Sequence, residues 1–408
     1  MLRTKSLKES SVSALTELPA YRWIVLALAW LGLLFAFVDR LAWANLALKV
    51  GGSLAVPISG LGAFVTAFYV GYVVSNAIGG LATDKFGASR MLGYALIPLG
   101  LATFAFGYAT SIKSGLAIQV LMGLAAGADY SACVKLTATW FDFKTRGRAM
   151  GLLTTASSVG VVITNATVPY LTERVGWIGV YQVLGAATAA VGIVCLAIVR
   201  DKNLSTIGSA VETGASLSSL SRNRDLLLLA LVGFGALWGT WGFAFWVNAL
   251  MVKGHGMSAS SAGLIGVMFG VGAIFSKPMI GFVSDVLGGK RKAILLICFA
   301  SFASMLLVFG NLKSEAAFMV AAPVLGVTAF IYTPLIVAMV AEIAGPRMIG
   351  SAYGLTNAFW QLGSVIVPLV VGVVYQETNS FAVAFAALAA GPAVATVAMF
   401  WVRERRCF

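Results

Sequence analysis

Twelve long apolar runs constrain this chain more than any other feature of its sequence. The first six lie near positions 23–47, 59–82, 90–110, 114–138, 148–170 and 178–199, and the second six near 226–250, 260–284, 293–311, 315–341, 350–374 and 380–402. About 20 consecutive apolar residues are enough for a helix to cross a bilayer. Only 11% of the residues are charged, less than half of the roughly 25% typical of soluble domains. The sequence therefore predicts an all-α membrane protein with twelve transmembrane helices.

The net charge of +13 follows from the predicted topology. With residues 1–22 as a cytoplasmic tail, 20 of the 28 Lys and Arg residues fall on the cytoplasmic side, 5 on the opposite side and 3 within helices. Such a bias is the positive-inside distribution of membrane proteins. The tail has no apolar segment typical of a cleaved signal peptide. We therefore expect a multi-pass protein of the bacterial inner (plasma) membrane, with both termini cytoplasmic and no nucleic acid partner.

A polar, Ser-rich stretch at 200–225 divides the twelve runs into two sets of six. Its composition is that of a flexible linker. The predicted organisation is a cytoplasmic tail (1–22), an N-terminal six-helix bundle (23–199), a cytoplasmic linker (200–225), a C-terminal six-helix bundle (226–402) and a short cytoplasmic tail (403–408).

Two internal repeats indicate that the halves are related. A motif with Gly, Asp four residues later and Gly three residues after that recurs at a displacement of 201, as Gly80, Asp84, Gly87 and Gly281, Asp285, Gly288. Three glycines recur at a displacement of 203, as Gly147, Gly151, Gly160 and Gly350, Gly354, Gly363. Both displacements are close to half the chain length, so we predict two pseudo-symmetric bundles.

Parallel six-helix repeats, together with the segment from Gly80 to Arg90, resemble the major facilitator superfamily and its signature loop. The resemblance covers essentially the whole chain and implies a carrier whose halves rock around a central site. Acidic residues at helix ends would then form ion pairs with basic loop residues in the closed state, the alternative being a static surface cluster. The predicted gating residues are Asp84, Arg90, Arg146, Arg148, Asp285 and Glu342.

Ionisable residues inside the predicted spans are costly to bury, so each is a functional hypothesis. Asp39 and Arg40 are neighbours in the first span and point about 100° apart, so they need not pair with each other. A carboxyl group in a partly dry cavity can carry a proton near neutral pH. A guanidinium offers a planar donor fork suited to a carboxylate or phosphate. The alternative for both residues is a structural ion pair with another helix.

Three segments resemble the anion:cation symporter branch of the superfamily. They are Asp39-Arg40, Phe68-Tyr69-Val-Gly71-Tyr72, and the stretch from Lys135 through Trp140-Phe141 to Arg146-Gly147-Arg148. The resemblance implies that Asp39 couples a proton and that Arg40 contacts an anionic substrate. Members of this branch transport sugar acids, monocarboxylates, dicarboxylates or organophosphates.

The chain departs from this branch in the fourth span. The branch commonly has a glutamate fourteen residues before the Trp, where this chain has Ala126. Asp129 lies about one turn later on a similar face and is a second proton-coupling candidate. In the eighth span, Lys277 precedes Pro278, as in carboxylate transporters of the oxalate and monocarboxylate branches, and we expect it to contact the anion. Further substrate-binding candidates are Lys135, Tyr69, Tyr332, Asn357 and Gln361.

Other classes of protein fit less well. The sequence has no P-loop, HExxH motif or nucleophile elbow, so no enzyme activity and no cofactor or metal is expected. A channel or receptor of another fold would not explain the repeat. The function predicted is secondary active transport, as proton-coupled symport of a small organic anion by a carrier that is a monomer. The alternatives are a proton-coupled exporter of drugs or cations with the same fold, and an anion exchanger.

Overall fold

The computed structural model describes residues 20–141, 143–201, 223–286, 291–344 and 349–403, which are almost entirely α-helical. The helices are α2 (Tyr21–Ser53), α3 (Ile58–Phe86), α4 (Ala88–Phe106), α5 (Ile112–Ala126), α6 (Asp129–Trp140), α7 (Phe143–Ile198), α9 (Arg224–His255), α10 (Ala259–Val286), α11 (Arg291–Gly310), α12 (Glu315–Phe330), α13 (Thr333–Ala344), α14 (Ile349–Thr378) and α15 (Phe381–Trp401).

Eleven helical segments of the described chain are long and apolar enough to cross a membrane. One of them, Ala149–Ile198, has 50 residues. At 1.5 Å per residue it would be about 75 Å long, enough for two crossings of a hydrocarbon core about 30 Å thick. It bends at Gly176, whose φ of 69° is unstrained because glycine lacks a Cβ atom. The predicted all-α fold of twelve transmembrane helices is confirmed, although the fifth and sixth runs join through this kink.

Two predicted helices are interrupted in the structure. The run at 114–138 is divided into α5 and α6 at Gly127–Ala128, and the run at 315–341 is divided into α12 and α13 at Ile331–Tyr332. Each run nevertheless forms one segment that is long and apolar enough to cross a membrane, Ile112–Trp140 and Glu315–Val340, so the predicted spans are confirmed and each contains a local turn. The two breaks lie at equivalent places in the two sequence repeats, so the halves share this irregularity.

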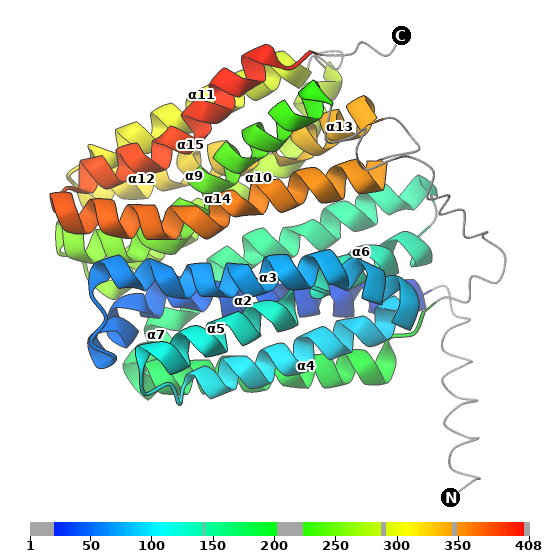
Figure 1. The fold of residues 1–408 in the computed structure, drawn as a ribbon, viewed down its shortest axis with the longest axis horizontal. Coiled ribbons are helices and arrows are strands. Elements are labelled where there is room, and N and C mark those ends of the chain that lie inside the picture. Colours follow the sequence, from blue (N-terminus) through cyan, green and yellow to red (C-terminus); the bar gives the residue numbers. More distant parts are fainter. Residues whose placement is uncertain (1–19, 142, 202–222, 287–290, 345–348, 404–408) are drawn as a thin grey trace, which may run out of the picture.

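The helices form two bundles (Figure 1). In the first bundle, α2 and α4 pack on α7, and α3 packs on α5. In the second bundle, α9 packs on α14 and α15, and α11 packs on α15. Each bundle brings the start of its first helix to the end of its last. The Tyr21 hydroxyl donates to the Ile198 carbonyl (2.7 Å), and the Arg403 amide donates to Asp225 Oδ1 (3.1 Å).

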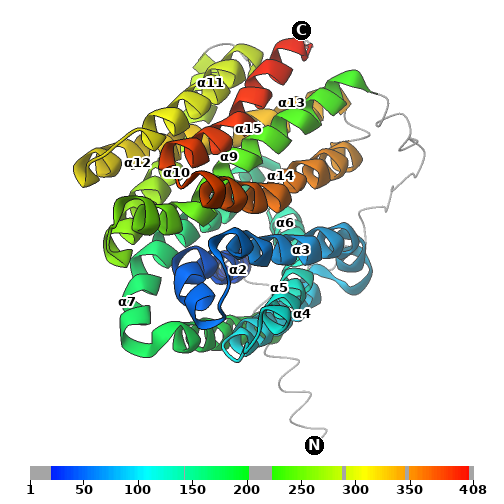
Figure 2. The ribbon, with the colours of Figure 1, turned by 60° about the vertical axis from the view of Figure 1, so that its left-hand side comes forward.

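Among the described residues, three helix pairs make the most extensive contacts between the bundles, and α14 lies beside α3 in both views (Figure 2). The other two pairs are α7 with α10 and α2 with α9. Glycines allow this close approach, because a Cβ atom on Gly62 of α3 would clash with the Pro368 backbone of α14.

The glycine of the repeated sequence motif has a local structural reason. Gly87 separates α3 from α4 with a φ of 91°, a conformation that favours glycine. Asp201, at the end of the first bundle, accepts hydrogen bonds from the Ser89 amide (3.0 Å) and hydroxyl (2.7 Å) in the first turn of α4. The motif therefore contains a tight turn that is fixed by a carboxylate.

Close helix contact gives a prediction about stability. A Cβ atom on Gly123 of α5 would overlap the Phe68 carbonyl and the Tyr72 amide of α3, whereas one on Gly151 would meet nothing within 4 Å. We expect Gly123→Ala to destabilise the purified protein by about 1–3 kcal/mol, and Gly151→Ala to leave it unchanged or slightly more stable. Thermal unfolding in detergent measures both. Equal unfolding temperatures for the two variants would contradict this packing.

Candidate functional site

Arg40 is the central residue of the candidate site. It lies in the middle of α2, is 7% exposed, and is surrounded by four aromatic rings that we call the ring cage. The guanidinium carbon lies 4.8 Å from the centroid of Phe37, 5.2 Å from Phe68, 5.6 Å from Tyr69 and 4.5 Å from Tyr72. A desolvated cation gains about 2 kcal/mol or more from an aromatic face. The cage therefore offsets part of the cost of burying this charge.

Asp129 supplies a carboxyl group to the same place. It is the first residue of α6, directly after the helix break, and is 1% exposed. One of its oxygens accepts from the Tyr130 amide, and the carboxyl group interacts electrostatically with Arg40. A helix N-terminus favours negative charge. Ala126, which replaces the glutamate of the related branch, is fully buried in the turn before the break.

Three buried polar atoms of this group have no hydrogen-bond partner among the described residues. By hydrogen-bond geometry they are Arg40 Nε, Asp129 Oδ2 and the Tyr69 hydroxyl oxygen, although Arg40 and Ser364 lie close to that hydroxyl. An unsatisfied buried polar group costs about 1–3 kcal/mol. A cationic donor, a hydroxyl and a carboxyl group are thus available together, in a setting suited to a charged, hydrogen-bonding ligand.

Asp39 has different surroundings from its neighbour Arg40, as their 100° separation predicts. It is 1% exposed and points into the first bundle, where the Thr103 hydroxyl of α4 donates to its Oδ2 at 3.1 Å. Thr188 and Tyr181 of α7 also face this carboxyl group. Asp39 and Asp129 therefore belong to two separate buried polar clusters.

The other predicted substrate contacts are distributed over both bundles. The Lys135 ammonium donates to the Thr83 carbonyl of α3 at 3.2 Å. Tyr332 is buried in the second bundle and shares a hydrogen bond of 3.1 Å with Thr240. Asn357 and Gln361 are half-buried on α14. The structure therefore gives Lys135 and Tyr332 local partners, and a substrate role for these four residues stays a prediction.

Of the predicted gating residues and Lys277, the structure describes the side chain of Arg90 alone. Arg90 is exposed in the first turn of α4. The remaining side chains lie outside the described part of the chain, and their proposed contacts stay predictions: Lys277, Asp84, Arg146, Arg148, Asp285 and Glu342.

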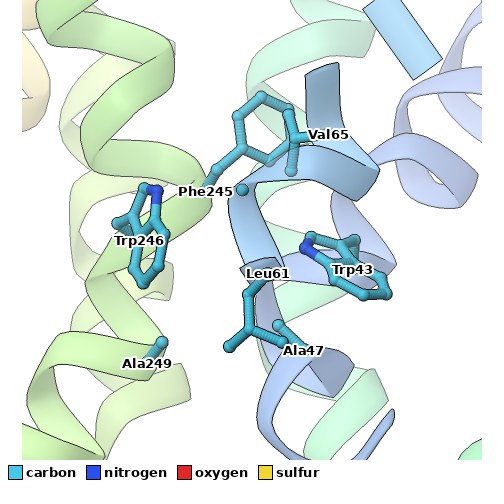
Figure 3. A pocket seen from close by; sticks show the side chains of 8 residues that line it. Trp43, Ala47, Leu61, Val65, Phe245, Trp246 and Ala249 are labelled. Carbon is cyan, nitrogen blue, oxygen red and sulfur yellow. The ribbon is translucent and has the colours of Figure 1, made fainter. Parts of the chain in front are cut away.

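The bundles meet tightly on one side of the ring cage, at what we call the closed seam (Figure 3). On the second-bundle side of the seam, the Trp246 indole of α9 donates to the Pro368 carbonyl of α14 at 3.0 Å, and Gly62 of α3 packs against the same carbonyl. The gap left in the seam is about 10 Å³, at the lower limit for holding one water molecule. The residues that line it are Trp43, Ala47, Leu61, Gly62, Val65, Phe245, Trp246 and Ala249.

An amide cluster of three asparagines joins the bundles beside the seam. Asn165 Oδ1 on α7 accepts from Asn45 on α2 at 3.2 Å and from Asn248 on α9 at 2.9 Å. The two donors are equivalent by the repeat, because Trp43-Ala-Asn45 recurs 203 residues later as Trp246-Val-Asn248. That Trp-x-Asn repeat is the sequence signal that could have identified the cluster.

Towards the start of α9 the bundles separate. A cavity of about 370 Å³ lies between α3, α9 and α14. Its lining is almost wholly apolar, with Val73 from the first bundle and, from the second, Leu226, Leu227, Ala230, Ala352, Leu355, Thr356, Ala358, Phe359 and Leu362. The cavity is thus bordered mainly by α9 and α14 of the second bundle and meets the first bundle at Val73 of α3.

Two bundles of membrane-crossing helices around a buried cation and carboxyl group have the architecture of a membrane carrier. The family model of the Major Facilitator Superfamily matches residues 28–259 and 229–406, and the chain belongs to this superfamily of transporters.

Its relatives include the hexuronate transporter of Bacillus subtilis, which is 24% identical over an alignment of 376 positions that covers 88% of this chain and 89% of that protein. The probable galactarate/D-glucarate transporter GudP of Escherichia coli is 22% identical over an alignment of 417 positions that covers 92% of each chain. A solved bacterial homolog of the human lysosomal transporter Spinster superposes with a TM-score of 0.74 at 14% identity, covering 94% of this chain and 97% of that one. This structural match supports the fold alone.

The amide cluster gives a prediction about closure of the seam. Asn165→Ala removes the acceptor shared by the bundles, at a cost of about 1–3 kcal/mol to the closed state, so the open population should rise roughly five- to a hundredfold. The readout is the rate at which a thiol reagent modifies Ala47→Cys in a variant without native cysteines.

Asn311→Ala is the matched control, because the Asn311 side chain, directly after α11, donates to the Leu307 carbonyl of that helix at 2.8 Å and does not join the bundles. An unchanged labelling rate in Asn165→Ala would contradict the role of the cluster in holding the seam closed.

Proposed function

We propose that this transporter carries a small organic anion of the carboxylate type together with a proton. The observation that carries the proposal is the ring cage, in which Arg40 lies beside Asp129 with buried polar atoms that lack protein partners. A carboxylate that accepts hydrogen bonds from Arg40 and the Tyr69 hydroxyl would satisfy two of those atoms. Charge-assisted hydrogen bonds of this kind are about twice as strong as neutral ones.

The relatives support an acidic sugar derivative as the substrate. The names of two of them specify hexuronate and galactarate/D-glucarate, which are carboxylates with several hydroxyl groups. Asn357 and Gln361 on α14 are proposed to meet such hydroxyl groups from the second bundle. Lys277 on α10, Lys135 and Tyr332 are proposed as further contacts at other stages of transport.

Alternating access is proposed to proceed by rocking of bundles 23–199 and 226–402 about the site. With both termini in the cytoplasm of a bacterial cell, the closed seam faces outward and the 370 Å³ cavity opens towards the cytoplasm. The charged motif residues Asp84 and Asp285, with Arg90, Arg146, Arg148 and Glu342, are proposed to hold the cytoplasmic side when it closes.

Proton coupling is assigned to Asp39 and Asp129. Both carboxyl groups are 1% exposed, and water-poor surroundings favour the neutral, protonated form of a carboxyl group. Asp129 is the carboxyl group that interacts with Arg40, so its charge and the substrate's charge compete for one cation. Protonation of Asp129 would release Arg40 to an incoming anion. Proton binding and anion binding would thereby be coupled.

An exporter of organic cations is the main rival. A positively charged substrate would be repelled by the Arg40 guanidinium whenever Asp129 is protonated and no longer offsets that charge. An anion exchanger would use the same cation but would need no proton. The exporter therefore differs from the proposal in the charge of its substrate. The exchanger differs from it in pH dependence.

Ligand binding gives a direct test. D-glucuronate or D-glucarate at 100 times its dissociation constant should stabilise the purified protein by about 2.7 kcal/mol, measured as a rise in unfolding temperature. Arg40→Ala should weaken binding about tenfold to a hundredfold, because it removes a charge-assisted hydrogen-bond donor. Stabilisation by lipophilic cations alone, retained in Arg40→Ala, would favour the exporter.

Uptake into proteoliposomes tests coupling. We expect an inwardly directed proton gradient to drive accumulation of the anion, and Asp129→Asn to abolish accumulation while anion exchange across the membrane persists. Asp39→Asn, in the separate cluster, shows whether both carboxyl groups are needed. Accumulation that ignores the proton gradient in the wild type would overturn symport in favour of exchange.

A further inference from the structure

The four rings of the cage fall into two kinds. Phe68 and Tyr72 have ring contacts only with each other and with Tyr69, all on α3, among the described residues. Phe37 and Tyr69 instead also touch the second bundle. Phe37 stacks on Trp241 of α9, with centroids 6.1 Å apart and an interplanar angle of 11°.

Tyr69 makes the second connection. Its ring meets Phe245 of α9 edge-on, with centroids 5.9 Å apart and an interplanar angle of 83°. Trp241 and Phe245 lie one turn apart on α9 and contact each other at 5.9 Å. Trp241 also contacts Phe330 of α12 at 6.4 Å, so this strip is part of the second bundle.

Arg40 and α9 therefore share two rings. We propose that Phe37 and Tyr69 are coupling residues, which transmit anion binding at Arg40 to the packing of α9 against α2 and α3. This inference rests on the proposed function, because it takes Arg40 to be the anion-binding cation. Beyond that function, the inference names the residues through which substrate binding changes the arrangement of the bundles.

The physical reason lies in the charge of Arg40. A cation is attracted to the face of a ring by the electrons of the π system. When a carboxylate pairs with the guanidinium, the net charge at the rings falls and the guanidinium turns towards the anion. The two rings that also pack on α9 then lose a cation that holds them in place, so the free energy of the α2–α9 and α3–α9 contacts changes.

Thermodynamic linkage makes this reciprocal. If anion binding changes the contacts of Phe37 and Tyr69 with α9, then a change in those contacts alters anion affinity by the same factor. A ligand shifts a conformational equilibrium only by its differential affinity for the two states. Phe68 and Tyr72 face Arg40 and have no ring contact with α9 among the described residues, so we expect them to contribute to affinity and not to this shift.

The test measures the distance between the bundles with and without anion. Spin labels at Lys85→Cys and Arg224→Cys, exposed at the end of α3 and the start of α9, report it in nanodiscs, in a background without the four native cysteines. D-glucuronate and D-glucarate are the probes, each at saturation. We expect either anion that binds to shift the distance distribution of otherwise wild-type protein.

Variants separate coupling from binding. Phe68→Leu removes a ring from Arg40 alone, so we expect roughly two- to thirtyfold weaker binding with the shift retained at saturation. Phe37→Leu and Tyr69→Leu should bind with similar losses but lose most of the shift. Phe37→Tyr and Tyr69→Phe keep the rings and should restore it.

Trp241→Leu provides a second route if Phe37→Leu fails to fold. It removes the α9 side of the stack without touching Arg40, and we expect it to lose the shift. A normal shift in Phe37→Leu or Trp241→Leu, or an equal loss in Phe68→Leu, overturns the inference while the proposed function stands. Failure of both anions to bind the wild type overturns the proposed function and this inference with it.

Discussion

Burial of the Arg40 guanidinium is the constraint on which the rest of this site depends. Moving a full charge out of water is expensive, and the protein offsets the cost with four aromatic faces and a neighbouring carboxyl group, Asp129. These groups come from α2, α3 and α6, so the first bundle alone builds the cation site. Because this site faces α9, the contact between the bundles also depends on how the charge of Arg40 is compensated.

The closed seam and the amide cluster show how the bundles are held at one end. The apolar surfaces of α2, α3 and α9 leave almost no space, and Asn165 accepts hydrogen bonds from repeat-equivalent asparagines of both bundles. A few hydrogen bonds of this kind are worth a few kcal/mol in total. That is the range in which a ligand can shift a two-state equilibrium. The seam is therefore stable yet able to open, as a carrier requires.

Much of the fold could be predicted from sequence, because crossing a bilayer requires long apolar runs and the repeat identifies two halves. The different surroundings of Asp39 and Arg40 follow from helix geometry alone. The break before Asp129 could not be predicted, because residues 114–138 form one predominantly apolar run that contains no proline. The amide cluster joins side chains from three helices far apart in the chain, and only the Trp-x-Asn repeat hints at it. Roles for residues such as Lys277 still rest on resemblance.

The most direct test of the central claim is an experimental density map of the protein in nanodiscs with bound D-glucuronate or D-glucarate. The account predicts a carboxylate oxygen about 2.7–2.9 Å from a guanidinium nitrogen of Arg40, the spacing of a charge-assisted hydrogen bond. It also predicts that the Tyr69 hydroxyl contacts the same anion. An anion bound elsewhere, with Arg40 still enclosed by its four rings and Asp129, would contradict the account.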